Sequence, residues 1–394
     1  MMFPQAQLGA YVDVVGGFAF KSETFAEEGV PIIRISDIQD GAVSLEKAAR
    51  IPVSNIGKGA RFTVEPGDIL IAMSGATTGK IGLAPQNLAG CVLQNQRVGN
   101  FKIRHPDEML KGYLKHFVCS ATYQNQVNIL MAGAAQPNIS SSQLESISLP
   151  VPPLPEQHRI AAILDQADAL RAKRREALAQ LDSLTQSIFI EMFGDPVANS
   201  MKWPDAKLGD LTLSASDGPH VSPTYAESGI PFLSTRHVRP GEVTWDDMKF
   251  ISPSDAAIQW KKCKPQLGDI LYTKGGTTGF AAIVDTAIEF AVWVHVALLK
   301  PNLLKVHSKW LECMLNSAYC YRQSQDFTHG IANRDLGLKR MVNIRMYQPP
   351  LSLQNEFASR MLVHSALVKS NREALAELDR LFTSLQHRAF SGEL

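Results

Sequence analysis

The feature that most constrains the fold is a long segment that occurs twice. Residues 175–182 read REALAQLD and residues 372–379 read REALAELD, so the two copies are offset by 372 − 175 = 197 residues in a chain of 394. A repeat offset by half the chain length divides the protein into two pseudo-equivalent halves. Each copy lies in a longer segment, 150–196 and 349–394, whose pattern is typical of one long helix.

Apolar residues recur in both segments at alternating spacings of three and four. This is the heptad pattern of a helix that packs lengthwise on another helix. Neither segment has the run of about 20 apolar residues that a membrane-spanning helix needs, so we expect the two stripes to bury each other. Leu164 and Leu178 widen the first stripe, and Met361 and Val368 supplement the second at its irregular start. The predicted seam is Ile160, Ile163, Ala167, Leu170, Arg174, Ala177, Leu181, Leu184 and Ile188 in the first helix and Phe357, Leu367, Asn371, Ala374, Leu378, Leu381 and Leu385 in the second.

The composition is that of an ordinary soluble protein. The net charge is +1 and 45% of the residues are hydrophobic. The five cysteines form no CxxC pair, and the N-terminus lacks a charged and then apolar signal, so we expect reduced thiols and a cytoplasmic location. Residues 1–149 are electrically neutral and residues 197–348 carry a net charge of +3. Any nucleic-acid surface must therefore be a local face of the protein.

The segments outside the helices predict two related domains of mixed structure. In the first, strand-like runs at 11–15, 31–35, 68–73 and 91–103 precede a helix at 111–130 and a polar loop at 133–140. The second repeats its anchors: GDIL at 67–70 returns at 268–271, and TTG at 77–79 returns at 277–279. We predict an α+β fold with domains at 1–149 and 197–348 and long helices at 150–196 and 349–394.

Catalytic and metal-binding motifs are missing from the sequence. GATTGK at 75–80 has three residues between its glycines and Ile81 after its lysine, whereas a P-loop needs four residues and then Ser or Thr. Its glycines are typical of a tight turn with a close backbone approach. There is no HExxH, no Cys/His metal spacing and no GxSxG. The sequence therefore predicts a protein with no catalytic site, metal or cofactor of its own.

The chain resembles the specificity (S) subunits of type I restriction–modification systems over essentially its whole length. The resemblance rests on GVPIIRISDI at 29–38, GDILI at 67–71, QPNI at 136–139 and ISLPVPPLPEQ at 147–157, with a weaker counterpart NRDLG at 333–337. It implies two target-recognition domains, each reading one half of a bipartite, asymmetric DNA site. It also implies that the two helices form an antiparallel coiled coil that spaces the domains and docks two methyltransferase subunits, with restriction subunits added. S-adenosylmethionine, and ATP and Mg²⁺ for restriction, would then be bound by those partner subunits.

Polar and basic residues in the variable loops are the expected DNA contacts, because base edges and phosphates are read by such side chains. In the first domain these are Lys21, Arg34, Ser36, Asp37, Ser74, Thr77, Thr78, Lys80, Gln94, Asn95, Gln96, Arg97 and Asn138. In the second they are His220, Thr235, Arg236, His237, Lys274, Thr277, Thr278, His295, Asn333 and Arg334. Two alternatives are a recognition subunit of a type IIB-like enzyme with a fused methylase–nuclease partner, and a two-domain scaffold that does not bind DNA.

Overall fold

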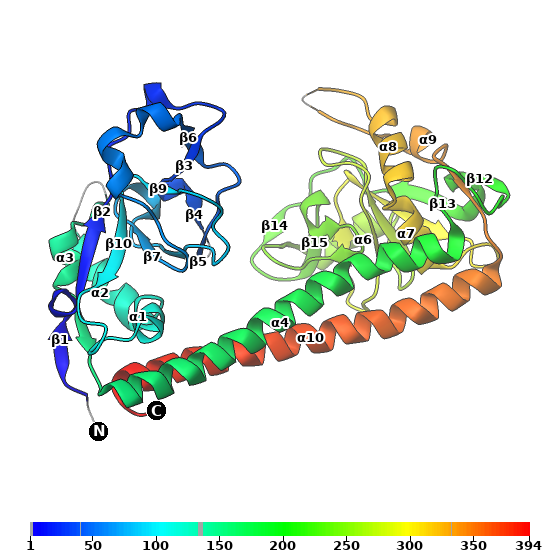
Figure 1. The fold of residues 1–394 in the computed structure, drawn as a ribbon. Coiled ribbons are helices and arrows are strands. Elements are labelled where there is room, and N and C mark those ends of the chain that lie inside the picture. The colour runs from blue at the N-terminus through cyan, green and yellow to red at the C-terminus, as the bar shows by residue number, and fades with distance from the viewer. Residues whose placement is uncertain (1–2, 40, 133–136, 332) are drawn as a thin grey trace. The chain divides into compact units, whose positions relative to one another are not determined.

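The computed structural model describes residues 3–39, 41–132, 137–331 and 333–394. The chain divides into two compact units (Figure 1). Unit 1 comprises residues Met1–Arg175 and Glu373–Leu394, and unit 2 comprises Glu176–Arg372. Each unit thus combines one globular part with portions of both long helices. The domain boundaries derived from the sequence stay a prediction.

Unit 1 contains a six-stranded sheet in the order β2-β10-β7-β8-β5-β4, a three-stranded sheet β6-β3-β9 and a two-stranded sheet β1-β11. Its strands are β1 (Gln5–Gln7), β2 (Val12–Gly16), β3 (Val30–Ile33), β4 (Ile38–Gln39), β5 (Gly41–Val43), β6 (Ala49–Ile51), β7 (Ile69–Ala72), β8 (Ile81–Leu83), β9 (Leu93–Gln94), β10 (Val98–Ile103) and β11 (Ser148–Pro150). Its shorter helices are α1 (Lys111–Val118), α2 (Ala121–Met131) and α3 (Ser141–Glu145).

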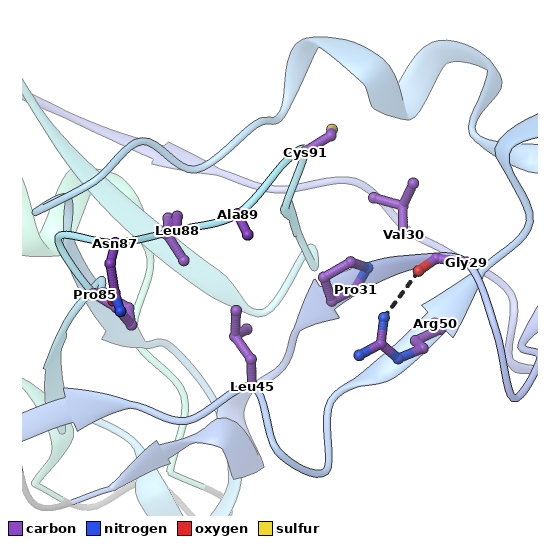
Figure 2. Close-up of a pocket in the computed structure, with 10 residues that line it drawn as sticks. All are labelled: Gly29, Val30, Pro31, Leu45, Arg50, Pro85, Asn87, Leu88, Ala89 and Cys91. Atoms are coloured by element: carbon purple, nitrogen blue, oxygen red, sulfur yellow. Dashed lines mark hydrogen bonds between the residues drawn. The ribbon is translucent and has the colours of Figure 1, made fainter.

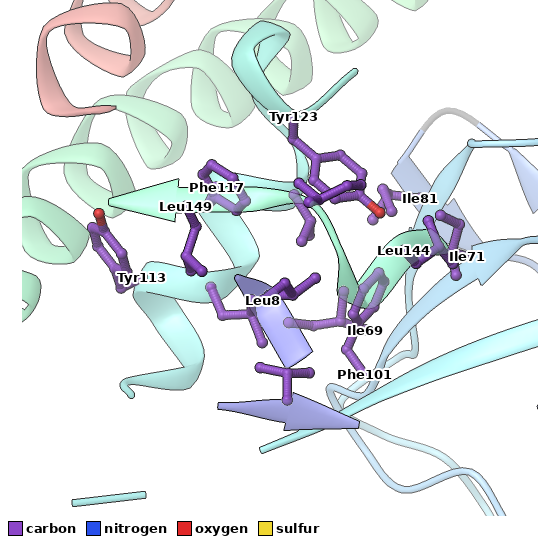
Figure 3. Close-up of a cluster of buried hydrophobic side chains, with 14 of the residues drawn as sticks. Leu8, Ile69, Ile71, Ile81, Phe101, Tyr113, Phe117, Tyr123, Leu144 and Leu149 are labelled. Atoms are coloured by element: carbon purple, nitrogen blue, oxygen red, sulfur yellow. The ribbon is translucent and has the colours of Figure 1, made fainter. Parts of the chain in front are cut away.

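Strand β7 shows why this sequence makes a sheet that is buried on both faces. Ile69 and Ile71 enter the core beneath the helices, whereas Leu70 and Ala72 enter a second core on the opposite face. Successive side chains of a strand point to opposite faces, so an unbroken apolar run is required where both faces are covered. Figure 3 shows the first of these cores, in which Phe117 and Tyr123 from the helices pack with Leu8 and Phe101.

Unit 2 contains sheets in the orders β13-β22-β19-β20, β14-β18-β15-β21, β16-β17 and β12-β23. Its strands are β12 (Asp205–Lys207), β13 (Thr212–Asp217), β14 (Tyr225–Ala226), β15 (Ile230–Leu233), β16 (Val238–Arg239), β17 (Glu242–Val243), β18 (Lys249–Ile251), β19 (Ile270–Thr273), β20 (Ala281–Ile283), β21 (Ala291–Val292), β22 (Val296–Pro301) and β23 (Arg345–Tyr347). Its shorter helices are α5 (Leu208–Leu211), α6 (Pro253–Trp260), α7 (Ser308–Leu315), α8 (Ala318–Phe327) and α9 (Leu338–Met341).

The strand pairings confirm that the two globular parts are copies of one fold. The strand order β2-β10-β7-β8 of unit 1 recurs as β13-β22-β19-β20 in unit 2. The parallel pair β3 and β9 recurs as β15 and β21, and the antiparallel pair β1 and β11 recurs as β12 and β23. The predicted mixed α and β class with an internal repeat is therefore correct.

The long helices are α4 (Leu154–Phe193) and α10 (Leu351–Ser391). In unit 1, Arg171 Nε of α4 donates to Asp379 Oδ1 of α10 at 2.6 Å. In unit 2, His364 of α10 lies 2.8 Å through its Nε2 from the carbonyl oxygen of Leu181 in α4. Later residues of α4 thus meet earlier residues of α10, and the helices run antiparallel. None of the helices in the described part of the chain is long and apolar enough to cross a membrane.

Two predicted elements are divided in the structure. The run at 91–103 forms β9 and β10, because residues 95–97 make a turn in which Val98 N–H donates to the Asn95 carbonyl at 3.0 Å. The helix predicted at 111–130 forms α1 and α2, because the Ser120 hydroxyl accepts from Tyr123 N–H and caps a new helix. Residues 133–136 of the predicted polar loop lie outside the described residues.

Candidate nucleic-acid interface and helix seam

Four loops of unit 1 meet at one edge of its sheets, which we call polar edge 1 (residues 34–37, 74–78, 95–97 and 137–139). Backbone hydrogen bonds join the loops: Asn95 N–H donates to the Ile33 carbonyl, Met73 N–H to Arg97, and Ile139 N–H to Met73, at 2.9 to 3.0 Å. The Thr77 hydroxyl donates to the Ile35 carbonyl at 3.2 Å and ties the first loop to the second. Loops held by backbone bonds present their side chains in a fixed arrangement.

The predicted DNA-contacting residues of unit 1 divide into two groups. Ser36, Gln96, Arg97 and Asn138 are exposed on polar edge 1, and Arg34, Ser74, Thr77, Thr78 and Asn95 are partly exposed there. Lys21 and Lys80 are exposed basic residues in neighbouring loops. Gln94 and Asp37, by contrast, are buried.

The two buried residues have structural roles, which corrects their prediction as base-reading side chains. The Gln94 amide donates to the carbonyls of Val15 and Val98 at 2.7 and 2.6 Å. Asp37 Oδ2 accepts from the backbone N–H of Arg34 at 2.8 Å and closes the turn at 35–37. Buried polar groups are retained where they satisfy backbone donors and acceptors, and such groups are not available to DNA.

The same assembly occurs in unit 2 and forms polar edge 2 (residues 234–237, 274–278, 293–295 and 333–336). Trp293 N–H donates to the Leu233 carbonyl, Lys274 N–H to His295, and Leu336 N–H to Lys274, at 2.7 to 2.9 Å. Among the predicted contacts, Arg236, Thr277, His295, Asn333 and Arg334 are exposed on this edge. His220 is exposed in a neighbouring loop, and Thr235 is half-buried.

Three predicted contacts of unit 2 are buried instead. His237 Nδ1 accepts from the backbone N–H of Ser234 at 2.8 Å, the task that Asp37 performs in unit 1. Burial, together with the nearby Arg236 guanidinium, lowers the pKa of His237. The Thr278 hydroxyl lies 3.0 Å from that of Thr328, and Lys274 is paired with carboxylates. These side chains support polar edge 2 from beneath.

The glycines of the two TTG motifs face helices. Gly79 and Gly279 have φ values of +86° and +96°, which side chains other than glycine rarely adopt. A Cβ atom on Gly79 would lie 2.9 Å from Val127 of α2, and one on Gly279 would lie 2.2 Å from Ser324 of α8. The close backbone approach that the sequence predicted is therefore an approach to the protein's own helices.

The helix seam differs from the predicted one by one column of residues. Leu170, Leu184, Leu367 and Leu381 are 49%, 40%, 49% and 51% exposed. Leu164, Leu178, Met361 and Val368, which the sequence placed beside the stripes, are buried or half-buried. So are four residues that the sequence did not single out, Arg171 and Thr185 in α4 and Leu375 and Phe382 in α10. The other predicted seam residues (Ile160, Ile163, Ala167, Arg174, Ala177, Leu181, Ile188, Phe357, Asn371, Ala374, Leu378 and Leu385) are buried or half-buried. In α4, two sets of residues spaced seven apart thus face the partner helix: 160, 167, 174 and 181, and 164, 171, 178 and 185. The set that begins three residues after Ile160 and includes Leu170 and Leu184 lies at the flank of the seam.

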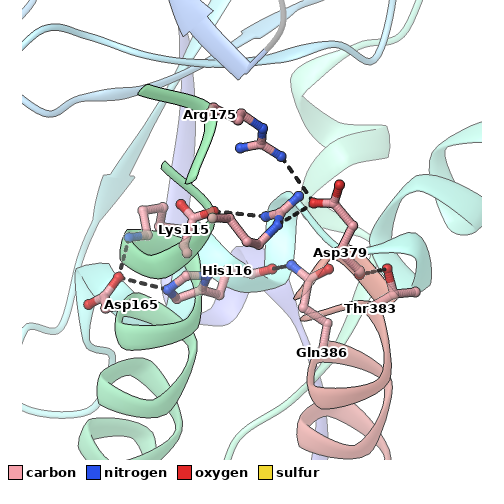
Figure 4. A network of polar contacts seen from close by, with 9 residues as sticks. Lys115, His116, Asp165, Arg175, Asp379, Thr383 and Gln386 are labelled. Atoms are coloured by element: carbon pink, nitrogen blue, oxygen red, sulfur yellow. Dashed lines mark hydrogen bonds and ion pairs between the residues drawn. The ribbon is translucent and has the colours of Figure 1, made fainter. Parts of the chain in front are cut away.

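A polar network joins the globular part of unit 1 to its helices (Figure 4). His116 of α1 is buried, and its Nε2 lies 2.8 Å from Asp165 of α4, which also pairs with Lys115. The pKa of His116 is lowered because burial and the Lys115 charge outweigh the attraction of Asp165. Arg171 lies over the Phe382 ring and shares Asp379 with Arg175. Ionic contacts therefore accompany apolar packing along this part of the seam.

A hollow of about 610 Å³ lies at the start of β3 (Figure 2). Polar edge 1 follows the other end of that strand. It is lined mainly by apolar side chains of 29–31 and 85–91 with Leu45, and the Arg50 guanidinium donates to the Gly29 carbonyl at 3.0 Å. No group of three or more His, Cys, Asp or Glu side chains in the described residues is placed to hold a metal ion.

One pair of residues that the sequence reasoning missed is Gln157 and Gln354. Each lies in the first turn of a long helix, is completely buried and makes three hydrogen bonds to backbone groups. The available signal was their separation of 354 − 157 = 197 residues, which matches the offset of the repeat.

Comparisons with known proteins include a family model that matches the first half of the chain and relatives that align over nearly all of it. Residues 6–180 match the family model described as type I restriction modification DNA specificity domain. The chain is 24% identical to the type I restriction enzyme EcoBI specificity subunit of Escherichia coli, covering 98% of this chain and 85% of that protein. It is 25% identical to the EcoKI specificity subunit of Escherichia coli strain K12, covering 99% and 88%.

Solved structures show the same fold. The crystal structure of a type I restriction–modification S subunit from M. genitalium aligns with a TM-score of 0.59 at 16% identity, covering 98% of this chain and 96% of that chain. A chain from a structural study of complex assembly and conformational transition in the type I R-M system aligns with a TM-score of 0.59 at 19% identity, covering 100% and 98%.

Proposed function

We propose that this chain, which belongs to the family of type I restriction–modification specificity subunits, is the non-catalytic subunit that reads a bipartite DNA site for such a complex. The observation that carries the proposal is the duplication of the polar edge. Both edges are assembled by matching backbone hydrogen bonds, yet they expose different side chains. Two different edges on one repeated scaffold fit two different half-sites.

The exposed side chains supply the chemistry of base reading. Gln96 and Asn138 on polar edge 1, and Asn333 on polar edge 2, carry amides that can pair with the major-groove edge of adenine. Arg97 and Arg334 can donate two hydrogen bonds to guanine. Lys21, Lys80 and Arg236 would contact phosphates and fix the register without reading sequence.

The flank of the helix seam offers a docking surface for methyltransferase subunits. The two helices run in opposite directions, and each faces the other with the equivalent two sets of residues in the repeat. The flanking column of each helix therefore falls on one face of the pair. Leu170 and Leu381 share that face in unit 1, as Leu184 and Leu367 do in unit 2. One apolar patch per unit is what two copies of one partner require.

The partner subunits would supply everything that this chain lacks for chemistry. The methyltransferase subunits would bind S-adenosylmethionine and transfer its methyl group to adenine in each half-site. Restriction subunits would use ATP and Mg²⁺ for cleavage, and the assembled complex would work in the cytoplasm, where its DNA substrate lies.

Methylation mapping tests the DNA-reading role directly. The full chain is produced with its methyltransferase subunits in a host, and the methylated sequence is determined. Arg97→Ala should weaken discrimination at one half-site by roughly 1–3 kcal/mol, the usual value of a good contact to a base pair, and should leave the other half-site unchanged. Arg104→Ala is the matched control, because Arg104 is an exposed arginine beyond the opposite end of β10. Equal effects of both variants, or equal effects on both half-sites, would contradict the proposal.

Native mass spectrometry tests the docking face. The wild-type chain should carry two methyltransferase subunits, and Leu170→Glu with Leu381→Glu should remove one of them. Val53→Glu is the control, since Val53 is 73% exposed and lies in a short 3-10 helix (Val53–Asn55), outside the two long helices. A double variant that keeps both subunits would show that they bind elsewhere.

A further inference from the structure

Equivalent backbone bonds reveal which residues correspond in the two polar edges. Met73 N–H donates to the Arg97 carbonyl and Lys274 N–H to the His295 carbonyl, while Ile139 N–H donates to Met73 and Leu336 N–H to Lys274. Lys274 therefore occupies the position of Met73. The TTG anchors would instead align it with Ser74. The loop in unit 2 is shorter by one residue, which places a charged residue where unit 1 has an apolar one.

The residue on the nearby strand also differs between the two units. Gly16 pairs with Gly99 in unit 1, and Asp217 pairs with Ala297 at the corresponding place in unit 2. Met73 of unit 1 lies in the apolar core. In unit 2, Lys274 Nζ lies 3.3 Å from Asp217 Oδ2, and the two residues are 5% and 4% exposed. Unit 2 thus has a buried ion pair at the two positions where unit 1 has a methionine and a glycine.

Lys274 also holds the loop above it. Its Nζ lies 3.2 Å from Oδ1 of Asp335, whose side chain is 46% exposed. Two backbone hydrogen bonds also hold that loop. Leu336 N–H donates to the Lys274 carbonyl at 2.7 Å, and Gly276 N–H donates to the Arg334 carbonyl at 2.9 Å. Asp335 in turn exchanges two backbone hydrogen bonds with His329, so it closes the loop whose tip carries Asn333 and Arg334.

We propose that Lys274 is a positioning residue that fixes the Asn333–Arg334 loop of polar edge 2 for DNA reading. Its ammonium group pairs with the Asp335 carboxylate, whose Oδ2 also lies 3.5 Å from Arg340, so the negative charge that would repel the DNA phosphates is offset. Through Asp217 the same ammonium group holds Asp335 against the sheet. Lys262, the second partner of Asp217, lies two residues beyond α6, and within the described part of the chain no hydrogen bond or ion pair joins it to this loop. The inference rests on the proposed DNA-reading function.

Amide hydrogen exchange on the full chain tests the clamp without DNA. Lys274→Met, which installs the residue of unit 1, should raise the exchange rates of the Gly276 and Leu336 amides about tenfold or more, a factor that corresponds to about 1.4 kcal/mol. Lys262→Met removes a lysine from the same aspartate and should leave both amides protected. Unchanged exchange in Lys274→Met, or equal loss in both variants, would overturn the proposal.

A double variant separates positioning from general stability. Lys274→Met alone leaves Asp217 buried with one partner fewer, which lowers the melting temperature. Lys274→Met with Asp217→Asn removes the stranded charge, so it should regain melting temperature while the two amides stay exposed to exchange. Lys274→Arg keeps the charge and should restore most of the amide protection. Recovery of amide protection together with melting temperature in the double variant would mean that Lys274 only stabilises the fold.

Methylation mapping with the partner subunits completes the test. Lys274→Met should relax specificity at the half-site that responds to Arg334→Ala, by about tenfold, and leave the other half-site unchanged. If that half-site keeps its wild-type specificity, the positioning role is overturned. If the wild-type complex shows no sequence preference, the DNA-reading function itself fails, and the exchange result still reports on the clamp.

Discussion

Gln157 of α4 and Gln354 of α10 make the same three hydrogen bonds 197 residues apart. Gln157 Oε1 accepts from Leu110 N–H at 2.9 Å, and its Nε2 donates to the carbonyls of Glu108 and Pro152 at 2.8 and 2.9 Å. Gln354 accepts from His307 N–H and donates to the carbonyls of Lys305 and Pro349. Each glutamine satisfies the backbone where a globular part meets a long helix, and so it fixes the start of that helix.

Replacing Gln157 with Ala should destabilise the protein strongly. The change leaves one buried N–H and two carbonyl groups without their partner, and an unsatisfied buried group costs roughly 1–3 kcal/mol. Allowing for partial relaxation, we expect a loss of about 2–4 kcal/mol in the free energy of unfolding, measured by denaturant titration. Gln166→Ala is the control, because Gln166 is exposed on the same helix. A loss below about 0.5 kcal/mol, the level of an ordinary surface change, would refute this role.

The apolar periodicity and the repeat predicted the long helices and the two related domains. The periodicity did not decide which residues of the helices face inward. A three–four spacing fits a seam built from Ala167 and Leu170, and it fits equally one built from Ala167 and Arg171. The structure selects the second, because Arg171 reaches Asp379 and covers Phe382 with its guanidinium group. The long aliphatic stem of arginine packs well at such a position, which a simple count of apolar residues overlooks.

The same limit applies to the polar edges. Gln94 is the last residue of β9 and Gln96 lies two residues later in the turn at 95–97, yet Gln94 is buried and bonds the backbone while Gln96 is exposed. Residues two apart would share one face in a continuous strand, but the turn at 95–97 ends that alternation, so residue type and spacing alone do not separate a supporting side chain from a reading one.

This pair yields a prediction with an internal control. Gln94→Ala should lower the free energy of unfolding by about 1–3 kcal/mol, because the carbonyls of Val15 and Val98 each lose a hydrogen bond from its amide. Gln96→Ala should leave stability within about 0.5 kcal/mol and change discrimination at one half-site. Thermal unfolding and methylation mapping of both variants decide the matter. The opposite assignment of effects would show that the supporting and reading roles are reversed.

His116 should make the protein less stable in mild acid. Its pKa in the folded protein is lowered from 6.5 by burial and by Lys115, so the folded state holds a neutral imidazole. The resulting stability is complete above the unfolded pKa of about 6.5 and declines as the pH falls toward the folded value. Burial raises the pKa of Asp165, but hydrogen bonds from Lys115 and His116 outweigh it and lower the pKa overall, so a further loss follows below about pH 4.

His116→Gln should flatten the decline that begins below about pH 6.5, since glutamine keeps a donor toward Asp165 but does not titrate. One proton contributes at most about 1.4 kcal/mol per pH unit. His237 and His307, whose pKa values are also lowered, continue to titrate in the variant and leave a residual slope. The measurement is the melting temperature against pH, with the exposed His387→Gln as control. Parallel curves for wild type and His116→Gln would contradict the prediction.

A fragment of residues 1–196 should form a two-fold dimer. It contains the globular part of unit 1 and all of α4 but lacks the α10 residues that cover α4 in unit 1, among them Phe382, Leu385 and Phe390. The repeat supplies a substitute, because residues 185, 188 and 193 of α4 are Thr, Ile and Phe at the equivalent positions. In the dimer, the second half of α4 from each copy can therefore pack against the first half of α4 from the other copy.

A charge exchange checks the register of that dimer. Asp182 is the repeat counterpart of Asp379, so Arg171 of one copy should pair with Asp182 of the other. Arg171→Glu should weaken the dimer, and Arg171→Glu with Asp182→Arg should restore it, as measured by light scattering across a dilution series. With methyltransferase subunits, the dimer should modify a palindromic site that contains one half-site twice. A folded monomer, a double variant as weak as the single one, or methylation of the original asymmetric site would each contradict this prediction.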